Sequence, residues 1–249
     1  MENLMQRAKE NPNFQSPMIE ESNLNSKGSH LYGVDCPKCN NKGYIFFERD
    51  GYRCTRECEC MVQRRNLKHI RESGLSELID MYSLGVFETP DLQREKIKNK
   101  AAQFAEKAEG WFFISGRAGS GKTHICVGIC KELMEQSKDV KYMMWRDDAV
   151  RLKGIVNDTE EYQRQIDKFK KPAVLYIDDF FKGKITEADV NLAFELLNYR
   201  YNSPKKITLI SSELGIEKIL EIDEAVGSRI YQRSKGFCLQ APEENWRLK

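Results

Sequence analysis

The chain has 249 residues, of which 40% are hydrophobic and 31% are charged, and its formal net charge is only +2. These values suit a soluble globular protein of one or two domains. With so little net charge, any contact with nucleic acid must come from a local basic patch. No apolar run approaches the roughly 18 residues of a membrane span, and the start of the chain lacks the apolar core of a signal peptide. We therefore expect a cytoplasmic protein with no membrane partner.

The first 35 residues are mostly polar and predict a flexible N-terminal arm. Five of the chain's eight cysteines follow this arm, and residues 43–53 between them predict two short strands joined by an Asp-Gly turn. A C-x-x-C pair followed by a second pair is typical of a structural zinc site, because Zn²⁺ favours four thiolate ligands in a tetrahedron. Residues 36–75 are therefore predicted to form a zinc-binding module with a basic linker.

Five cysteines compete for the four places around such a zinc ion. The ligands that we predict are Cys36, Cys39, Cys58 and Cys60. This choice leaves Cys54 on the hairpin, and Cys54 in place of one of the four stays open as an alternative. A set of unligated thiols or a redox pair is the other interpretation of the same cysteines.

Residues 76–249 alternate between apolar strands and helical segments. The predicted strands are 111–114, 140–145, 173–177, 207–210 and 236–240, and the predicted helices are 92–108, 123–135, 147–170, 186–201 and a stretch ending at Ile230. This alternation predicts an α/β fold with a five-stranded parallel sheet and helices on both faces. Such sheets bind ligands at the carboxyl ends of their strands.

A glycine-rich octapeptide lies between the first of these strands and a helix. In that context the pattern G-x-x-x-x-G-K-[ST] binds phosphate, because backbone N–H groups and the helix N-terminus surround the anion. Lys122 is expected to reach the β- and γ-phosphates, and Thr123 to offer its hydroxyl to Mg²⁺. The predicted binding residues are Gly116, Arg117, Ala118, Gly119, Ser120, Gly121, Lys122 and Thr123. The loop predicts a nucleoside-triphosphate site.

Two acids, Asp178 and Asp179, follow the apolar strand at residues 173–177. An acidic strand end is the usual partner of a phosphate loop: Asp178 is expected to hold Mg²⁺, and Asp179 to orient the attacking water. The pair predicts hydrolysis of the bond between the β- and γ-phosphates.

Together these motifs resemble the AAA+ ATPases, and within them the bacterial and phage replicative helicase loaders of the DnaC/DnaI-like group, with the related transposition ATPases of the IstB type. The resemblance rests on the glycine loop, the two acids, Ser211-Ser212 after the fourth strand and Gly227-Ser228-Arg229. The cysteine module resembles the zinc-binding N-terminal part of Gram-positive-type loaders. The resemblance implies ATP as the nucleotide.

The resemblance also implies roles for particular residues. Ser211 and Ser212 match the polar sensor near the γ-phosphate, with Ser211 on the nucleotide and Ser212 in catalysis. Arg229 matches the arginine finger that acts on a neighbouring subunit. Asp179 departs from the glutamate of most AAA+ motors, which implies slow, switch-like hydrolysis. The stretch after Arg229 is also too short for the usual helical lid, which implies a truncated one.

The leading hypothesis is an ATP-controlled loader that carries a hexameric replicative helicase onto single-stranded DNA and self-associates on its partner or on DNA. An IstB-like transposition regulator and an ATP-binding adaptor with little turnover are the alternatives from the same fold. A P-loop kinase for a small molecule would need a lid and a specificity pocket, for which the sequence offers no candidate.

Overall fold

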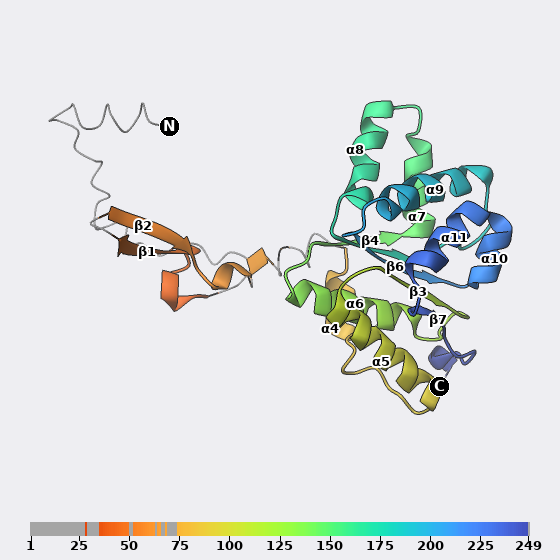
Figure 1. Ribbon diagram of the computed structural model, residues 1–249, viewed down its shortest axis with the longest axis horizontal. Helices are drawn as coiled ribbons and strands as arrows, with labels where there is room; N and C mark the ends of the chain where they lie inside the picture. The colour runs from red at the N-terminus through yellow and green to blue at the C-terminus, as the bar shows by residue number, and fades with distance from the viewer. Residues whose placement is uncertain are drawn as a thin grey trace. The chain divides into compact units, whose positions relative to one another are not determined.

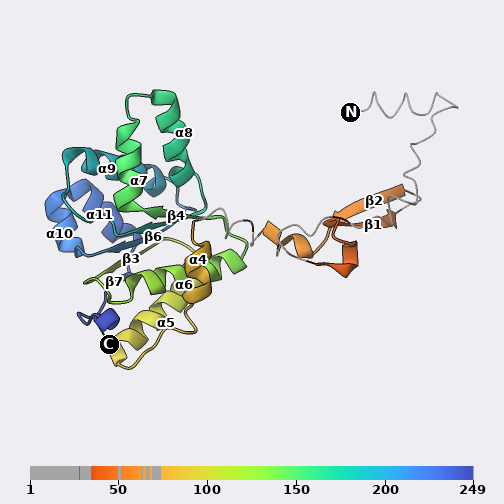
Figure 2. The same ribbon diagram turned by 180° about the vertical axis from the view of Figure 1, so that it is seen from behind.

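The computed structural model describes residue 28, residues 35–49, 52–62, 64–65 and 68, and residues 74–248. The chain divides into two compact units, Met1–Arg64 and Arg65–Lys249 (Figures 1 and 2). Apart from Gly28 and Asp35, the predicted arm lies outside the described residues. Among the helices that are described, none is long and apolar enough to cross a membrane.

The described part of the first unit is a β-hairpin beside a cysteine-containing turn. Strands β1 (Tyr44–Arg49) and β2 (Tyr52–Glu57) pair antiparallel, with Phe47 opposite Cys54. A short 3-10 helix, η2 (Pro37–Cys39), precedes them. The two predicted strands are confirmed, whereas the predicted Asp-Gly turn lies outside the described residues.

Five strands of the second unit form one parallel sheet. The strands are β3 (Trp111–Ser115), β4 (Val140–Met144), β5 (Val174–Asp178), β6 (Ile207–Ser212) and β7 (Cys238–Gln240). Their order across the sheet is β4-β5-β6-β3-β7. Parallel neighbours require crossover connections, which helices supply here. The predicted α/β fold with a five-stranded parallel sheet is confirmed.

Helices cover both faces of this sheet (Figures 1 and 2). They are α4 (Ser76–Met81), α5 (Leu92–Lys107), α6 (Lys122–Glu135), α7 (Trp145–Gly154), α8 (Thr159–Lys170), α9 (Glu187–Tyr201), α10 (Ile216–Ile222) and α11 (Glu224–Arg233), followed by the 3-10 helix η3 (Trp246–Leu248). Helices α4, α5 and α6 pack on one face, and α7 to α11 pack on the other.

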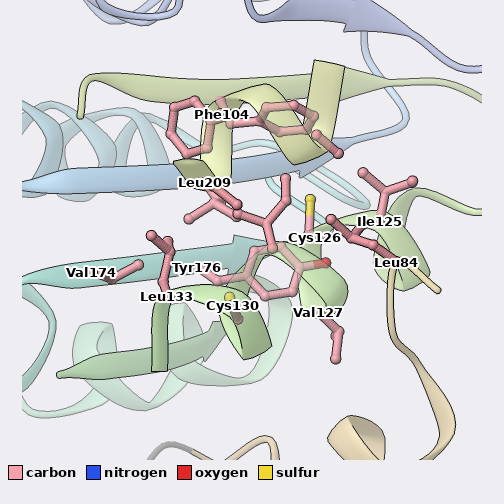
Figure 3. Close-up of a cluster of buried hydrophobic side chains, with 14 of the residues drawn as sticks. Leu84, Phe104, Ile125, Cys126, Val127, Cys130, Leu133, Val174, Tyr176 and Leu209 are labelled. Carbon is pink, nitrogen blue, oxygen red and sulfur yellow. The ribbon is translucent and has the colours of Figure 1, made fainter. Parts of the chain in front are cut away.

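Each face has its own hydrophobic cluster, because side chains alternate along a strand. In β3, Phe112 and Ile114 join one cluster, whereas Trp111 and Phe113 join the other. Figure 3 shows the first cluster, in which the ring of Tyr176 lies among residues of α6. This double coverage anchors the strands whose ends carry the polar motifs.

Two of the sequence predictions are wrong around α7. The second strand ends at Met144, and Trp145 begins α7 instead of ending the strand. The reason is local: the Asp148 carboxylate accepts a hydrogen bond from the Met144 N–H at 2.9 Å, which starts a helix there. The single helix predicted over 147–170 is two helices, because Asp158 caps α8 by accepting from the Glu161 N–H at 3.1 Å.

Arg200 ties the second unit together at the opposite end of its sheet. This side chain of α9 is fully buried, and burial lowers its pKa to about 9. Its guanidinium donates to the carbonyls of Phe169, Lys170, Pro172 and Ile207 and to the hydroxyl of Thr208. These bonds join the end of α8 to the starts of β5 and β6.

We predict that Arg200→Met lowers the free energy of unfolding of the second unit by about 3 kcal/mol or more, because several buried carbonyls lose their donor. Urea unfolding followed by tryptophan fluorescence measures this unit alone, since all 3 tryptophans (Trp111, Trp145 and Trp246) lie in it.

Arg164→Met is the matched control. Arg164 is 70% exposed and pairs with Glu161 on the surface of α8, so its loss should cost less than about 1 kcal/mol. Equal losses in the two variants would contradict the structural role of Arg200.

Candidate nucleotide and metal sites

The glycine loop takes a conformation that its glycines allow. Gly116, Gly119 and Gly121 have positive φ values of 151°, 76° and 93°. Residues other than glycine rarely adopt such values. A Cβ atom on Gly119 would lie 1.9 Å from Asn245 Oδ1. The loop therefore turns tightly from β3 into α6, with Gly121 as the N-cap of that helix.

Lys122 is folded back onto this loop. Its ammonium donates to the carbonyls of Gly116 and Arg117, both at 2.8 Å. Burial lowers the pKa of Lys122, and the nearby carboxylates of Glu213, Asp179 and Asp178 oppose this shift. The first helical residue after the loop is thus a cation held among the backbone groups that a phosphate would approach.

Asp178, the last residue of β5, is surrounded by hydroxyl donors. Tyr176 OH donates to its Oδ1 at 2.7 Å, and Tyr142 OH donates to its Oδ2 at 3.1 Å. Ser211 donates to Oδ1 as well. The Thr123 hydroxyl lies 3.4 Å from Oδ1, so the structure brings the predicted Thr123 and Asp178 together.

Asp179 has a different environment from its neighbour. It adopts a left-handed backbone conformation, with φ of 54°, and its side chain is one-third exposed. Lys182 Nζ donates to Asp179 Oδ2 at 2.9 Å and lies 3.1 Å from Glu213 Oε1. Asp179 is therefore paired with a cation that also touches a second acid.

The two serines at the end of β6 have separate partners. Ser211 contacts Asp178, and the Asp179 N–H donates to the Ser211 hydroxyl at 3.3 Å. Ser212 instead donates to the Phe180 carbonyl at 2.7 Å and accepts from the Leu214 N–H. The sensor roles of both serines stay predictions; of the two, Ser211 has the contact with an acidic residue.

A cavity of about 220 Å³ lies over the glycine loop. One part of its wall is charged, with Lys122, Asp179, Lys182 and Glu213, and another part is aromatic. The aromatic lining residues are Tyr82, His124 and Trp246. A nucleotide needs both kinds of surface, since its phosphates are anionic and its base is apolar and flat.

Arg229 does not line this cavity. Its guanidinium donates to Asn198 Oδ1 at 3.1 Å and to the Ala225 carbonyl at 2.7 Å, and it lies 4.9 Å from the centre of the Phe194 ring. These contacts place it on the α9–α11 surface of its own chain. Its action on a neighbouring subunit stays a prediction.

In the first unit, four cysteine sulfurs come together. The Sγ atoms of Cys36, Cys39, Cys58 and Cys60 all lie within 4.8 Å of one another, and all four residues are buried. Cys36 and Cys58 are 3.8 Å apart, and Cys39 and Cys60 are 3.6 Å apart. Cys54 lies on β2, outside this cluster.

The buried amide of Asn41 holds the cysteine turn. Its side-chain oxygen accepts from the Cys36 N–H at 2.6 Å, and Arg64 donates to the same oxygen at 3.4 Å. Asn40 and Asn41 both have positive φ, which folds the chain sharply after Cys39. The Gly43 N–H then donates to the Cys39 sulfur at 3.4 Å.

Several residues in or beside the cavity could not be predicted from the sequence. Trp246 lines the cavity from a distant part of the chain, and Tyr142 donates to Asp178 beside it; no local pattern marks either residue. Lys182 had a signal, since it stands three residues after Asp179. The turn that brings the two side chains together includes two residues with positive φ, Asp179 and Phe181.

The parallel sheet, its strand order and the glycine loop before α6 define an AAA+ nucleoside-triphosphate-binding protein. The chain belongs to the family of IstB-like ATP binding proteins, whose family model matches residues 42–234.

Three known proteins are similar to this chain, one in sequence and two in fold. The chain is 29% identical over 252 residues to the phage-like element PBSX protein XkdC of Bacillus subtilis (strain 168), covering 94% of this chain and 92% of XkdC. The DnaC helicase loader shares the fold with a TM-score of 0.58 and 18% identity, over 67% of this chain and 99% of that one. Replication initiator DnaA, bound to AMPPCP and single-stranded DNA, has a TM-score of 0.55 and 20% identity, over 66% of this chain and 50% of that one.

Proposed function

We propose that the protein is an ATPase of DNA replication that loads a hexameric replicative helicase onto single-stranded DNA. The observation that carries the proposal is the contact of Thr123 with Asp178 beside the glycine loop that holds Lys122, in a fold that is similar to that of a helicase loader. The family match supports ATP as the nucleotide. The relative from a phage-like element supports a mobile replication system as its setting.

The glycine loop fits a phosphate group because its glycines carry no side chains. The backbone N–H groups can therefore approach the phosphate oxygens closely. Lys122 would supply the cation for the β- and γ-phosphates. Thr123 and Asp178 offer hydroxyl and carboxylate oxygens 3.4 Å apart, the hard donors that Mg²⁺ prefers. When bound, Mg²⁺ neutralises phosphate charge; the donors around Asp178 keep its carboxylate in place for that task.

Asp179 would orient the attacking water. Lys182 donates to Asp179 Oδ2 at 2.9 Å, and pairing with a cation weakens a carboxylate as the acceptor of a hydrogen bond from water. Such an arrangement supports slow hydrolysis that a partner accelerates.

The partners follow from the same assignment. A loader requires a ring helicase and single-stranded DNA in the cytoplasm, and the arginine-finger role of Arg229 requires contact between copies. DnaA in complex with single-stranded DNA shares this fold, which supports DNA binding by a protein of this shape.

Two alternatives use the same site. The pairing of Asp179 with Lys182 favours an adaptor that binds ATP with little turnover. The family name favours an IstB-like regulator of transposition. A test of helicase delivery onto single-stranded DNA separates the loader from the adaptor and from the transposition regulator.

We predict that Lys122→Ala abolishes nucleotide binding and helicase delivery, because the main phosphate cation is lost. Asp179→Asn should keep binding and lose turnover, because only the water-orienting group changes. Calorimetry with ATP and Mg²⁺, phosphate release, and deposition of the helicase from the same genome on circular single-stranded DNA measure the three steps.

Each outcome identifies one part of the proposal. Normal turnover in Asp179→Asn would show that Asp179 has another role. Nucleotide-dependent turnover without helicase delivery would overturn the loader function and leave the ATPase intact. The control is Lys131→Ala, a lysine on α6 outside the cavity.

The cysteine cluster fits a zinc ion. A tetrahedron of sulfurs about 2.3 Å from zinc has edges of about 3.8 Å, and two sulfur pairs are 3.8 and 3.6 Å apart. A disulfide would bring two sulfurs to about 2.05 Å. Four sulfurs lie together here, whereas a redox pair needs only two, and this grouping favours a metal.

We predict a single zinc ion per chain, held by Cys36, Cys39, Cys58 and Cys60. Elemental analysis of protein purified without added metal should find it, and Cys58→Ser should lose it. Cys54→Ser is the matched control and should retain zinc, because Cys54 lies outside the cluster. A folded, metal-free first unit would overturn the zinc site.

Arg229 would act in the nucleotide site of a neighbouring copy. A finger typically contributes about 10³-fold or more to the rate in other nucleotidases. Its present partners, Asn198 and the Phe194 ring, are on the surface of α9 and leave the guanidinium partly exposed.

We predict that Arg229→Ala and Lys122→Ala are each inactive in the presence of helicase and single-stranded DNA, and that their mixture recovers activity. A mixed interface can pair an intact Lys122 site with an intact Arg229. Arg233→Ala, on the same helix, should remain active. Absence of recovery while both variants still assemble would place Arg229 in its own subunit's site.

A further inference from the structure

The chain from Ala241 to Leu248 folds back over the glycine loop. After β7, the Ala241 N–H donates to the Ser115 carbonyl at 2.7 Å, and the Trp246 N–H donates to the Gly119 carbonyl at 3.0 Å. Asn245 lies so close to Gly119 that a Cβ there would collide with it. Figures 1 and 2 show this end of the chain beside α5.

Helix α5 holds the Trp246 ring in place. The Arg94 guanidinium lies 4.2 Å from the ring centre, a cation–π distance. Arg94 is itself almost fully buried. Its Nε atom lies 3.2 Å from Asp91 Oδ2, and its Nη2 atom lies 3.7 Å from Glu244 Oε2. The indole is therefore fixed by an arginine whose own position is set by two acids.

Trp246 lines two neighbouring cavities. The first is the charged cavity over the glycine loop, and the second has a volume of about 290 Å³ and includes Val86 and Phe87. The residues common to both are Gly121, His124 and Trp246. A group that is anionic at one end and flat and apolar at the other would find a complementary surface on each side of these residues.

We infer that Trp246 is a nucleotide-binding residue: its ring forms a wall of the base site together with His124, and Arg94 positions it. This inference rests on the proposed nucleotide site and adds a contact to the base that the glycine loop cannot provide. Stacking on an aromatic ring is sequence-tolerant, because every base has a flat face. Trp246 therefore strengthens binding of nucleoside triphosphates in general.

The experiment compares AMPPCP with inorganic tripolyphosphate, which lacks the base and ribose, by calorimetry in the presence of Mg²⁺. Trp246→Ala should weaken AMPPCP binding by about tenfold and leave tripolyphosphate binding unchanged. Leu248→Ala is the matched control: Leu248 is in the same short helix, is 83% exposed, and should bind both ligands like the wild type. An equal loss for both ligands would mean that Trp246 only supports the loop, and would overturn the inference.

Tryptophan fluorescence gives an independent reading on the full chain. AMPPCP should change the emission of the wild type but not that of Trp246→Phe, which keeps an aromatic wall and still binds. Trp111 and Trp145 stay in the core in both proteins. The same emission change in Trp246→Phe would overturn the inference, whereas failure of the wild type to bind AMPPCP would overturn the proposed function itself.

Discussion

The sheet's three inner strands are covered on both faces, and this constraint decides where the chain can place polar chemistry. All residues of β3, β5 and β6 are buried. A polar group inside such a strand must find a partner within the protein. Thr208 finds one in Arg200, near the start of β6. The remaining polar groups gather at the carboxyl ends, where Asp178, Ser211 and the glycine loop can meet.

The two acids at the end of β5 differ in how firmly they are held. Asp178 is buried and accepts from one hydroxyl on each of β4, β5 and β6, from the Thr123 hydroxyl and from the backbone N–H of Asp179. Its carboxylate is fixed before any cation arrives, which avoids a reorganisation cost. Asp179 is partly exposed and paired with a single lysine on its own turn. A fixed carboxylate suits metal binding, and a releasable one suits a switch.

The parts of this architecture that depend on local spacing were predictable from the sequence. The glycine loop, the strand with its two acids and the four cysteines each occupy a short stretch whose pattern requires a particular backbone. The break between α7 and α8 was also encoded locally, in Asp158, but the charged composition of the stretch concealed it. The roles of Arg200, Tyr142 and Trp246 could not be predicted. Each has a partner 28 or more residues away in the sequence, namely Pro172, Asp178 and Arg94 in that order, and only the folded chain brings them together.

The nucleotide cavity has two sides of different origin, and this affects how the site can be regulated. Its phosphate side comes from the ends of buried strands and from α6, which are fixed by the core. Its aromatic side comes from Tyr82, from His124 on α6 and from Trp246, which lies against Arg94 of α5. In the proposed base site, a displacement of Arg94 on α5 would act first on Trp246, because the two side chains are in contact. Asp178 ends a strand that is buried along its whole length, so such a displacement would change the affinity for the base more than the position of the Asp178 carboxylate.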